Sequence, residues 1–237
     1  MDAEQKGWEI AECIRRKKMF NLSFRRFGNG IYISHTDVLR SLNRIMRRAE
    51  IDVAYSKGFN KHMSLKLTQP LPLGIASDDE WVTVNVESKI TKEEFFEKFK
   101  INCPPFLEAL EIYETEINPS LASKVTASKY FIKSISAYKY KTEIENLKNG
   151  CIMKVKKAGE FIDKDVTDYI YEVDVNENGI ICTVAFGSKN LRMDSFCNYL
   201  NENYGLKIKL SEVLRLKQLI DDNGNMITVN EYIGRLK

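Results

Sequence analysis

The chain has only two histidines, and both lie in a segment rich in basic residues. Asp37 follows His35 by two positions and could orient its imidazole as a general base. His62 could supply a second acid or base, as a metal-independent RNA-processing enzyme would need. Ser34 and Asp37 are equally explained as the capping residues of a helix, so catalysis competes here with a purely structural interpretation.

A phosphate could bind at the same place, because the amides at a helix N-terminus and a histidine both suit an anion. The carboxylate of Asp37 works against this interpretation. A second candidate for phosphate contact is the loop at residues 55–62. Gly58 permits close backbone approach, Lys57 and Lys61 supply charge, and Phe59 could stack on a base. The structural alternative is a turn with Phe59 in the core and solvated lysines.

Charge is distributed unevenly along the chain. The formal net charge is +3, but residues 17–66 contain eleven Lys or Arg against three acids, which leaves that segment at +8. Such asymmetry predicts one face for an anionic partner. The residues predicted to bind nucleic acid are Arg25, Arg26, His35, Arg40, Arg44, Arg47, Arg48, Lys57, Phe59, Asn60, Lys61, His62 and Lys66.

A helix over residues 38–49 must position most of these arginines. Its apolar residues fall within an arc of about 120° at 100° per residue, and its arginines lie on the other side. Ser34 can cap this helix. Alternation of apolar and polar residues predicts a strand at 20–24, and the turn Gly28-Asn29-Gly30 leads into a second strand at 31–33.

The remaining pattern predicts an α+β protein of two ferredoxin-like α/β sandwich domains with mostly antiparallel sheets. Thr91 and Glu94 form a second capping box, before a helix that ends at Cys103. The predicted units are an N-terminal extension at 1–18, a basic domain at 19–116, a linker at 117–128 and a second domain at 129–237. The strands predicted in and around them are 53–55, 63–67, 82–86, 107–113, 130–135, 151–155, 169–175, 180–186, 206–220 and 226–230, and the other helices are 139–148 and 193–205.

Several classes of protein are excluded by what the sequence lacks. Five cysteines are widely spaced without a CxxC pair, so we expect no zinc or iron–sulfur site, only buried thiols of a reducing cytoplasm. No phosphate-loop, dinucleotide, zinc-protease or hydrolase motif occurs, and we expect no cofactor. No apolar run approaches the roughly 20 residues that span a bilayer, so we expect no membrane partner.

Residues 20–81 resemble the radical-SAM-linked protein family, a bacterial domain of unknown function. The matching residues are Phe24, Gly28, Ile33-Ser34-His35, Asp37, Arg40, Arg47-Arg48-Ala49, Tyr55-Ser56, Gly58-Phe59-Asn60, His62, Leu71-Pro72-Leu73-Gly74, Ser77 and Glu80. Lys61 and Met63 depart from the pattern, since prolines are expected there. The resemblance implies a radical SAM protein as partner and an accessory role on a macromolecule, and it supplies no catalytic residues.

We therefore expect a non-catalytic accessory protein whose basic N-terminal face binds tRNA or another structured RNA. One alternative is a docking subunit whose basic face meets an acidic surface of the radical SAM partner without nucleic acid. The other is a metal-independent RNA-processing enzyme that uses His35 or His62 as its acid or base. Charge alone does not separate a phosphate track from a carboxylate-rich protein surface.

Overall fold

The computed structural model describes residues 18–57, 59–87, 89–157, 160–187 and 189–236. It contains one large sheet of nine strands, in which every pairing but one is antiparallel, and a separate two-stranded hairpin. The predicted combination of helices with a mostly antiparallel sheet is confirmed. Most of the predicted N-terminal extension lies outside the described residues, and Lys18 already belongs to the first strand.

The first half arranges four strands and two helices in the order strand, helix, strand, strand, helix, strand. In the sheet, β4–β1–β3–β2 lie side by side. Side chains such as Phe20 and Val84 pack beneath the apolar faces of both helices. The elements are β1 (Lys18–Arg26), α2 (His35–Arg48), β2 (Leu65–Leu67), β3 (Ala76–Val86), α3 (Lys92–Ile101) and β4 (Leu107–Thr115).

Both predicted helix starts of this half are confirmed. The Ser34 side chain accepts a hydrogen bond from the Asp37 amide, and Thr91 with Glu94 forms a complete capping box. The predicted strand at 31–33 is wrong, because residues Gly28–Tyr32 form a 3-10 helix, η1. Gly28 starts it with φ at 55°, a conformation that glycine adopts without strain.

The second half repeats this order of strands and helices, with a separate two-stranded hairpin inserted and a short strand and helix added at the end. In the sheet, β10–β5–β9–β8 lie side by side. Its core lies between the sheet and helices that include α6. The elements are α4 (Leu121–Lys124), β5 (Val125–Lys133), η2 (Ile135–Tyr140), α5 (Lys141–Glu145), η3 (Asn146–Asn149), β6 (Ile152–Lys157), β7 (Glu160–Asp165), η4 (Thr167–Tyr169), β8 (Ile170–Asn176), β9 (Gly179–Ala185), α6 (Met193–Tyr204), η5 (Leu210–Glu212), β10 (Val213–Asp222), β11 (Asn225–Thr228) and α7 (Val229–Gly234).

The predicted hairpin at 169–186 and the helix that ends at Gly205 are confirmed. The helix expected at 139–148 is broken into η2, α5 and η3. The strand expected at 206–220 begins only at Val213. The end of the strand predicted at 226–230 belongs instead to α7, which a Thr228–Glu231 capping box starts.

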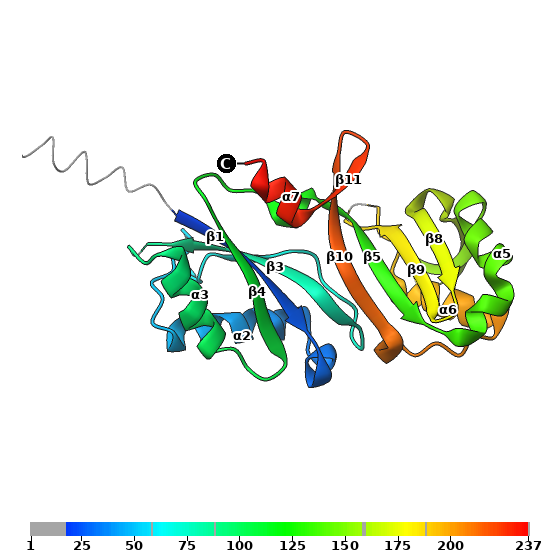
Figure 1. Ribbon diagram of the computed structural model, residues 1–237, viewed down its shortest axis with the longest axis horizontal. Helices are drawn as coiled ribbons and strands as arrows, with labels where there is room; N and C mark the ends of the chain where they lie inside the picture. Colours follow the sequence, from blue (N-terminus) through cyan, green and yellow to red (C-terminus); the bar gives the residue numbers. More distant parts are fainter. Residues whose placement is uncertain (1–17, 58, 88, 158–159, 188, 237) are drawn as a thin grey trace, which may run out of the picture.

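The two halves share one sheet, because β10 runs parallel to β3 where both strands begin. Leu214 is the register partner of Ala76, and Arg215 is that of Ser77. Figure 1 shows α2 and α3 at one end of this sheet, α5 and α6 at the other, and α7 near the middle. The predicted linker at 117–128 is part of this packed region, since it contains α4 and the first residues of β5. No helix among the described residues is both long and apolar enough to cross a membrane.

Gly179 is a position where the fold requires glycine. Its φ is 153°, and a Cβ atom there would lie 2.1 Å from the carbonyl oxygen of Ile132. We predict that Gly179→Ala lowers the free energy of unfolding by about 2 kcal/mol or more, because backbone must move in the β8–β9 hairpin. Urea denaturation measures this cost. Gly150→Ala, where nothing lies within 4 Å of the new Cβ, is the matched control; equal costs would contradict the prediction.

Candidate functional site

The exposed face of α2 carries the predicted arginine stripe. Arg40, Arg44, Arg47 and Arg48 are all exposed, while the apolar side of the helix is buried. Arg40 pairs with Asp37 at 2.7 Å, and Arg48 donates to the Asn102 carbonyl at 3.3 Å. Among the described residues, no carboxylate pairs with Arg44 or Arg47. These two cations are therefore free to bind an anionic partner.

The loop at residues 55–63 presents an aromatic ring to solvent. A bridge between Tyr55 and Met63 closes it, and the Ser56 amide donates to the His62 carbonyl at 2.8 Å. Phe59 is 104% exposed, so the alternative in which this ring enters the core is wrong. The loop residues Lys57, Asn60, Lys61 and His62 are exposed as well, as is Lys66 on β2, whereas Gly58 lies outside the described residues.

The loop lies near the end of β3 at which α2 finishes. The first residue of α2 lies near Ser77, since Arg26 is the register partner of Ser77 and donates to the Ile33 carbonyl. After α2 the chain rejoins the sheet at Val53, which bridges Val86 at the other end of β3. The second half of α2 and the loop therefore both lie near Val86, the last residue of β3.

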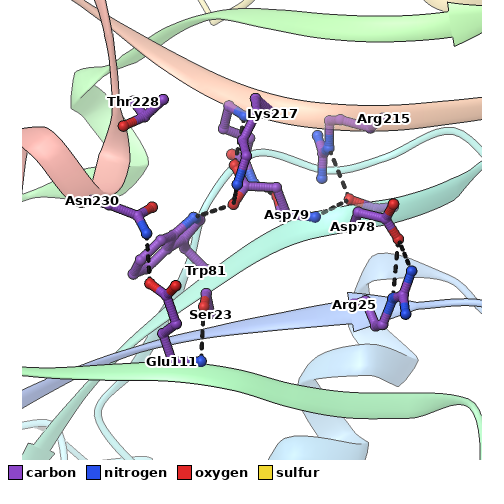
Figure 2. A network of polar contacts seen from close by, with 12 residues as sticks. Ser23, Arg25, Asp78, Asp79, Trp81, Glu111, Arg215, Lys217, Thr228 and Asn230 are labelled. Atoms are coloured by element: carbon purple, nitrogen blue, oxygen red, sulfur yellow. Dashed lines mark hydrogen bonds and ion pairs between the residues drawn. The ribbon is translucent and has the colours of Figure 1, made fainter.

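The two predicted binding residues on β1 do not belong to this surface. Arg25 is held by two carboxylates, Asp78 at 2.7 Å (Figure 2) and Glu108 at 3.4 Å. Arg26 is only 2% exposed, so a macromolecule cannot reach it. The prediction that Arg26 is a surface contact is therefore wrong. Side chains two residues apart on a strand lie on the same face, so Arg26 points to the same side of β1 as the core residue Phe24.

Arg26 instead belongs to a buried charged row across the strands that join the two halves. Arg26 on β1, Ser77 on β3 and Arg215 on β10 are register partners, so their side chains share one face. The Arg215 Nε donates to Ser77 Oγ at 3.3 Å, and its Nη2 pairs with the Glu80 carboxylate. Arg215 is 0% exposed and Glu80 7%. We call Arg26, Ser77, Glu80 and Arg215 the arginine cluster.

The two arginines of this cluster differ in how their charge is compensated. Burial alone would lower the pKa of Arg215, but the Glu80 carboxylate and other neighbours raise it overall. Burial lowers the pKa of Arg26, which Glu80 opposes and Arg215 reinforces. Burial also lowers the pKa of His35, whose ring interacts with Glu80 and both arginines and so lies beside the cluster.

Where β3 and β10 diverge, a second polar group fills the space beside the cluster. The Asp79 carboxylate accepts from the Gln218 backbone amide at 2.6 Å. It also accepts from Trp81 Nε1 at 3.0 Å and lies 3.7 Å from Lys217 Nζ (Figure 2). Burial raises the pKa of Asp79, which these donors and Lys217 oppose. The hydrogen-bonding capacity of the Asp79 carboxylate is thus largely used by neighbouring protein groups.

The structure does not bring His35 and His62 together. His35 lies near Glu80, whereas Ser64, two residues after His62, accepts the Asn85 amide further along β3. At about 3.3 Å per strand residue the two places are on the order of 15 Å apart. Asp37 is engaged by Ser34 and Arg40, and His62 Nδ1 lies 3.1 Å from Ser56 Oγ and from the Asn60 carbonyl. Within the described part of the chain no hydrogen bond joins either histidine to a carboxylate, so the predicted orientation of His35 by Asp37 is not seen.

Four cysteines are free thiols, and Cys13 lies outside the described residues. Burial raises the pKa of Cys103 to about 11 and that of Cys197 to about 12, and it raises the pKa values of Cys151 and Cys182 as well. These thiols stay protonated at neutral pH and are poor nucleophiles.

A hollow of about 1050 Å³ lies in the second half, between the β6–β7 hairpin and α6. Its lining mixes apolar groups such as Phe161 with both signs of charge, such as Lys164 and Glu202. This mixture favours no single ligand chemistry. The sequence pattern does not predict this hollow, because it does not predict strand β7, which forms one wall.

A family model described as "Uncharacterized protein conserved in bacteria (DUF2344)" matches residues 20–219. The chain belongs to this family. The family match spans both halves, and its description names neither an activity nor a radical SAM partner.

A comparison with curated proteins finds no match. Among solved structures, the small subunit of acetolactate synthase from Thermotoga maritima is similar at 13% identity, with 84% of this chain and 93% of that one covered. Its TM-score of 0.25 supports no conclusion about the fold.

Removal of the cluster's carboxylate tests its structural role. We predict that Glu80→Gln lowers the free energy of unfolding by about 3–5 kcal/mol, because it leaves two buried guanidinium groups without a counter-charge. Asp78→Asn is the matched control: Asp78 partners the half-buried Arg25, which also pairs with Glu108, so its loss should cost about 1 kcal/mol or less. Urea denaturation of both variants gives the comparison. Similar costs for the two would contradict the buried cluster.

Proposed function

We propose that the protein binds structured RNA through a surface formed by the second half of α2 and the loop at 55–63. The single observation that carries this proposal is the fully exposed ring of Phe59 between Lys57 and Lys61. Exposing a large apolar ring costs hydrophobic free energy, and a ring flanked by cations is what single-stranded bases stack upon. The loops and bulges of a structured RNA offer such bases beside their phosphates.

The unpaired arginines of α2 supply the electrostatic part of the surface. Arg44 and Arg47 reach solvent, no carboxylate in the described ranges pairs with them, and each can neutralise a phosphate. Since Arg26 is buried and Arg25 is paired, the expected contacts are fewer than the composition of the segment suggests. An accessory role beside a radical SAM protein remains part of the proposal and rests on the sequence resemblance alone.

We also infer that residues 19–116 and 129–237 are two ferredoxin-like units. The matching strand orders β4–β1–β3–β2 and β10–β5–β9–β8 support this inference, as does a helix after the first and third strand of each half. In this arrangement the first unit would hold the RNA surface.

Charge reversal on α2 tests the electrostatic part. We predict that Arg44→Glu with Arg47→Glu weakens binding of a fluorescent tRNA or RNA hairpin at least tenfold, because two phosphate contacts become repulsive. Fluorescence anisotropy between low and moderate salt measures this change. For each phosphate contact, log K of the wild type should fall by about 0.7–0.9 for every tenfold rise in salt concentration.

Lys133→Glu with Lys148→Glu makes the same change of charge at exposed positions of the second half and should lower affinity far less. Equal losses, or no binding by the wild type, would reject the proposal. Binding of an acidic protein without RNA would favour the docking alternative.

Removal of the exposed ring tests the stacking part. We predict that Phe59→Ala weakens RNA binding by about 5- to 150-fold while the salt dependence stays unchanged, since stacking contributes about 1–3 kcal/mol per base and releases no counterions. Phe161→Ala removes another exposed ring, at 72% exposure on β7, and should leave affinity unchanged. A Phe59→Ala variant that binds like the wild type would show that the ring makes no contact.

A further inference from the structure

We propose that the arginine cluster is a binding site for a phosphate group. The buried Arg26 and Arg215 would hold it between the two halves of the protein. The site goes beyond the RNA surface, because the cluster is enclosed and lies at the opposite end of α2.

The first observation is a set of buried N–H donors without acceptors. Arg26 Nε and Nη2 and Arg215 Nη1 are buried, and none of them has a hydrogen-bond partner among the residues that the structure describes. Arg26 makes one bond, from Nη1 to the Ile33 carbonyl at 3.4 Å. Buried donors are nearly always paired, so three from two neighbouring guanidinium groups indicate a missing acceptor.

The second observation is which atoms of Arg26 are free. Nε and Nη2 form one edge of the guanidinium group, the edge that binds a carboxylate or a phosphate with two parallel hydrogen bonds. This chain uses that edge elsewhere: Arg25 directs it at Asp78, and Arg192 directs it at Asp194. Figure 2 shows the first of these pairs. In Arg26 the same edge is buried, and no acceptor from the described parts of the chain meets it.

The third observation is the balance of charge. Arg26 and Arg215 carry two positive charges, and Glu80, which pairs with Arg215, carries one negative charge. Asp79 also interacts with Arg215, but its negative charge is matched by Lys217, whose Nζ lies 3.7 Å away. The remaining positive charge lies in a nearly dry environment, where an unpaired ion costs several kcal/mol. A water molecule could accept a hydrogen bond there but could not neutralise this charge, whereas a bound anion does both.

A phosphate fits better than a carboxylate because of where the donors come from. Arg26 and Arg215 stand on strands that flank β3, so their donors approach from two directions. The oxygens of a tetrahedral phosphate point in several directions, whereas a planar carboxylate fills one guanidinium edge. Ser77 lies between the two strands and offers its hydroxyl group to the same space, and the His35 ring interacts electrostatically with both arginines.

The test is phosphate binding by the full-length, nucleic-acid-free protein after dialysis into chloride. We expect saturable binding of inorganic phosphate by titration calorimetry, with one site per chain. At a hundred times Kd, phosphate should raise Tm by about 5 °C or more relative to sodium chloride or sodium acetate of equal ionic strength. Adenosine monophosphate as a second ligand distinguishes the sources: binding of inorganic phosphate alone assigns the free ion, and binding of both assigns a phosphate ester as well.

Variants locate the site. Arg26→Lys keeps the charge but removes the free edge, and it should lower phosphate affinity at least tenfold. Arg25→Lys, on the neighbouring residue whose edge is already occupied, should leave phosphate affinity unchanged. Arg44→Glu with Arg47→Glu should also retain phosphate binding, so failure of the RNA surface and failure of this site are distinguishable.

Two results would overturn the proposal. One is a wild-type protein that gives no calorimetric signal and whose Tm responds equally to phosphate, acetate and chloride. The other is phosphate binding that Arg26→Lys leaves intact. Because the first measurement needs only the wild-type protein, the proposal stays testable even if the Arg26 variant does not fold.

Discussion

The structure depends on the burial of two guanidinium groups and one carboxylate where its two halves meet. Arg26, Ser77 and Arg215 lie in one row across β1, β3 and β10, and Glu80 pairs with Arg215. The parallel contact between β3 and β10 joins the halves into one sheet. A charged group buried in such a place is costly unless its partners are complete, so the relative position of the halves is tied to the groups that satisfy these arginines.

The cluster also determines how α2 is presented. Arg26 donates to the carbonyl of Ile33, the residue before the Ser34 cap, and His35 lies beside the buried charges. The start of α2 is therefore fixed at the junction. Its second half runs to the other end of β3, where Arg44, Arg47 and the loop with Phe59 face solvent. Buried cations thus anchor the helix at one end, and exposed cations provide a binding surface at the other.

Local signals in the sequence were sufficient for much of the fold. The Ser34 cap, the Thr91–Glu94 capping box and the turn before Gly179 each depend on a few adjacent residues, and the structure contains all three. Where a strand begins in polar residues the local signal fails. β3 starts at Ala76 and includes Asp78 and Asp79, because Gln218 and Lys217 of another strand satisfy Asp79. The local signal also fails at Gly28–Tyr32, which forms a 3-10 helix where the pattern predicts a strand. This segment has too few apolar residues to show a helical or strand period.

The binding residues were predicted with mixed success, because charge in a sequence carries no information about burial. The exposed arginines of α2 follow from helical periodicity, which is a local property. Arg26 does not, since its burial depends on Arg215 and Glu80, two residues that lie 135 positions apart from each other. The matching residues Ser77 and Glu80 belonged to the family resemblance, yet only the fold shows that they lie beside Arg26 and His35.

The most direct measurement is an NMR titration that resolves the side-chain Nε–H signals of the arginines in the full-length chain. On addition of a structured RNA, the account predicts that the signals of Arg44 and Arg47 shift together with the backbone amides of the loop at 55–63. The signals of Arg26 and Arg215 should keep their positions, since both are enclosed. Shifts confined to the second half, or a spectrum that RNA leaves unchanged, would contradict the assignment of the binding surface.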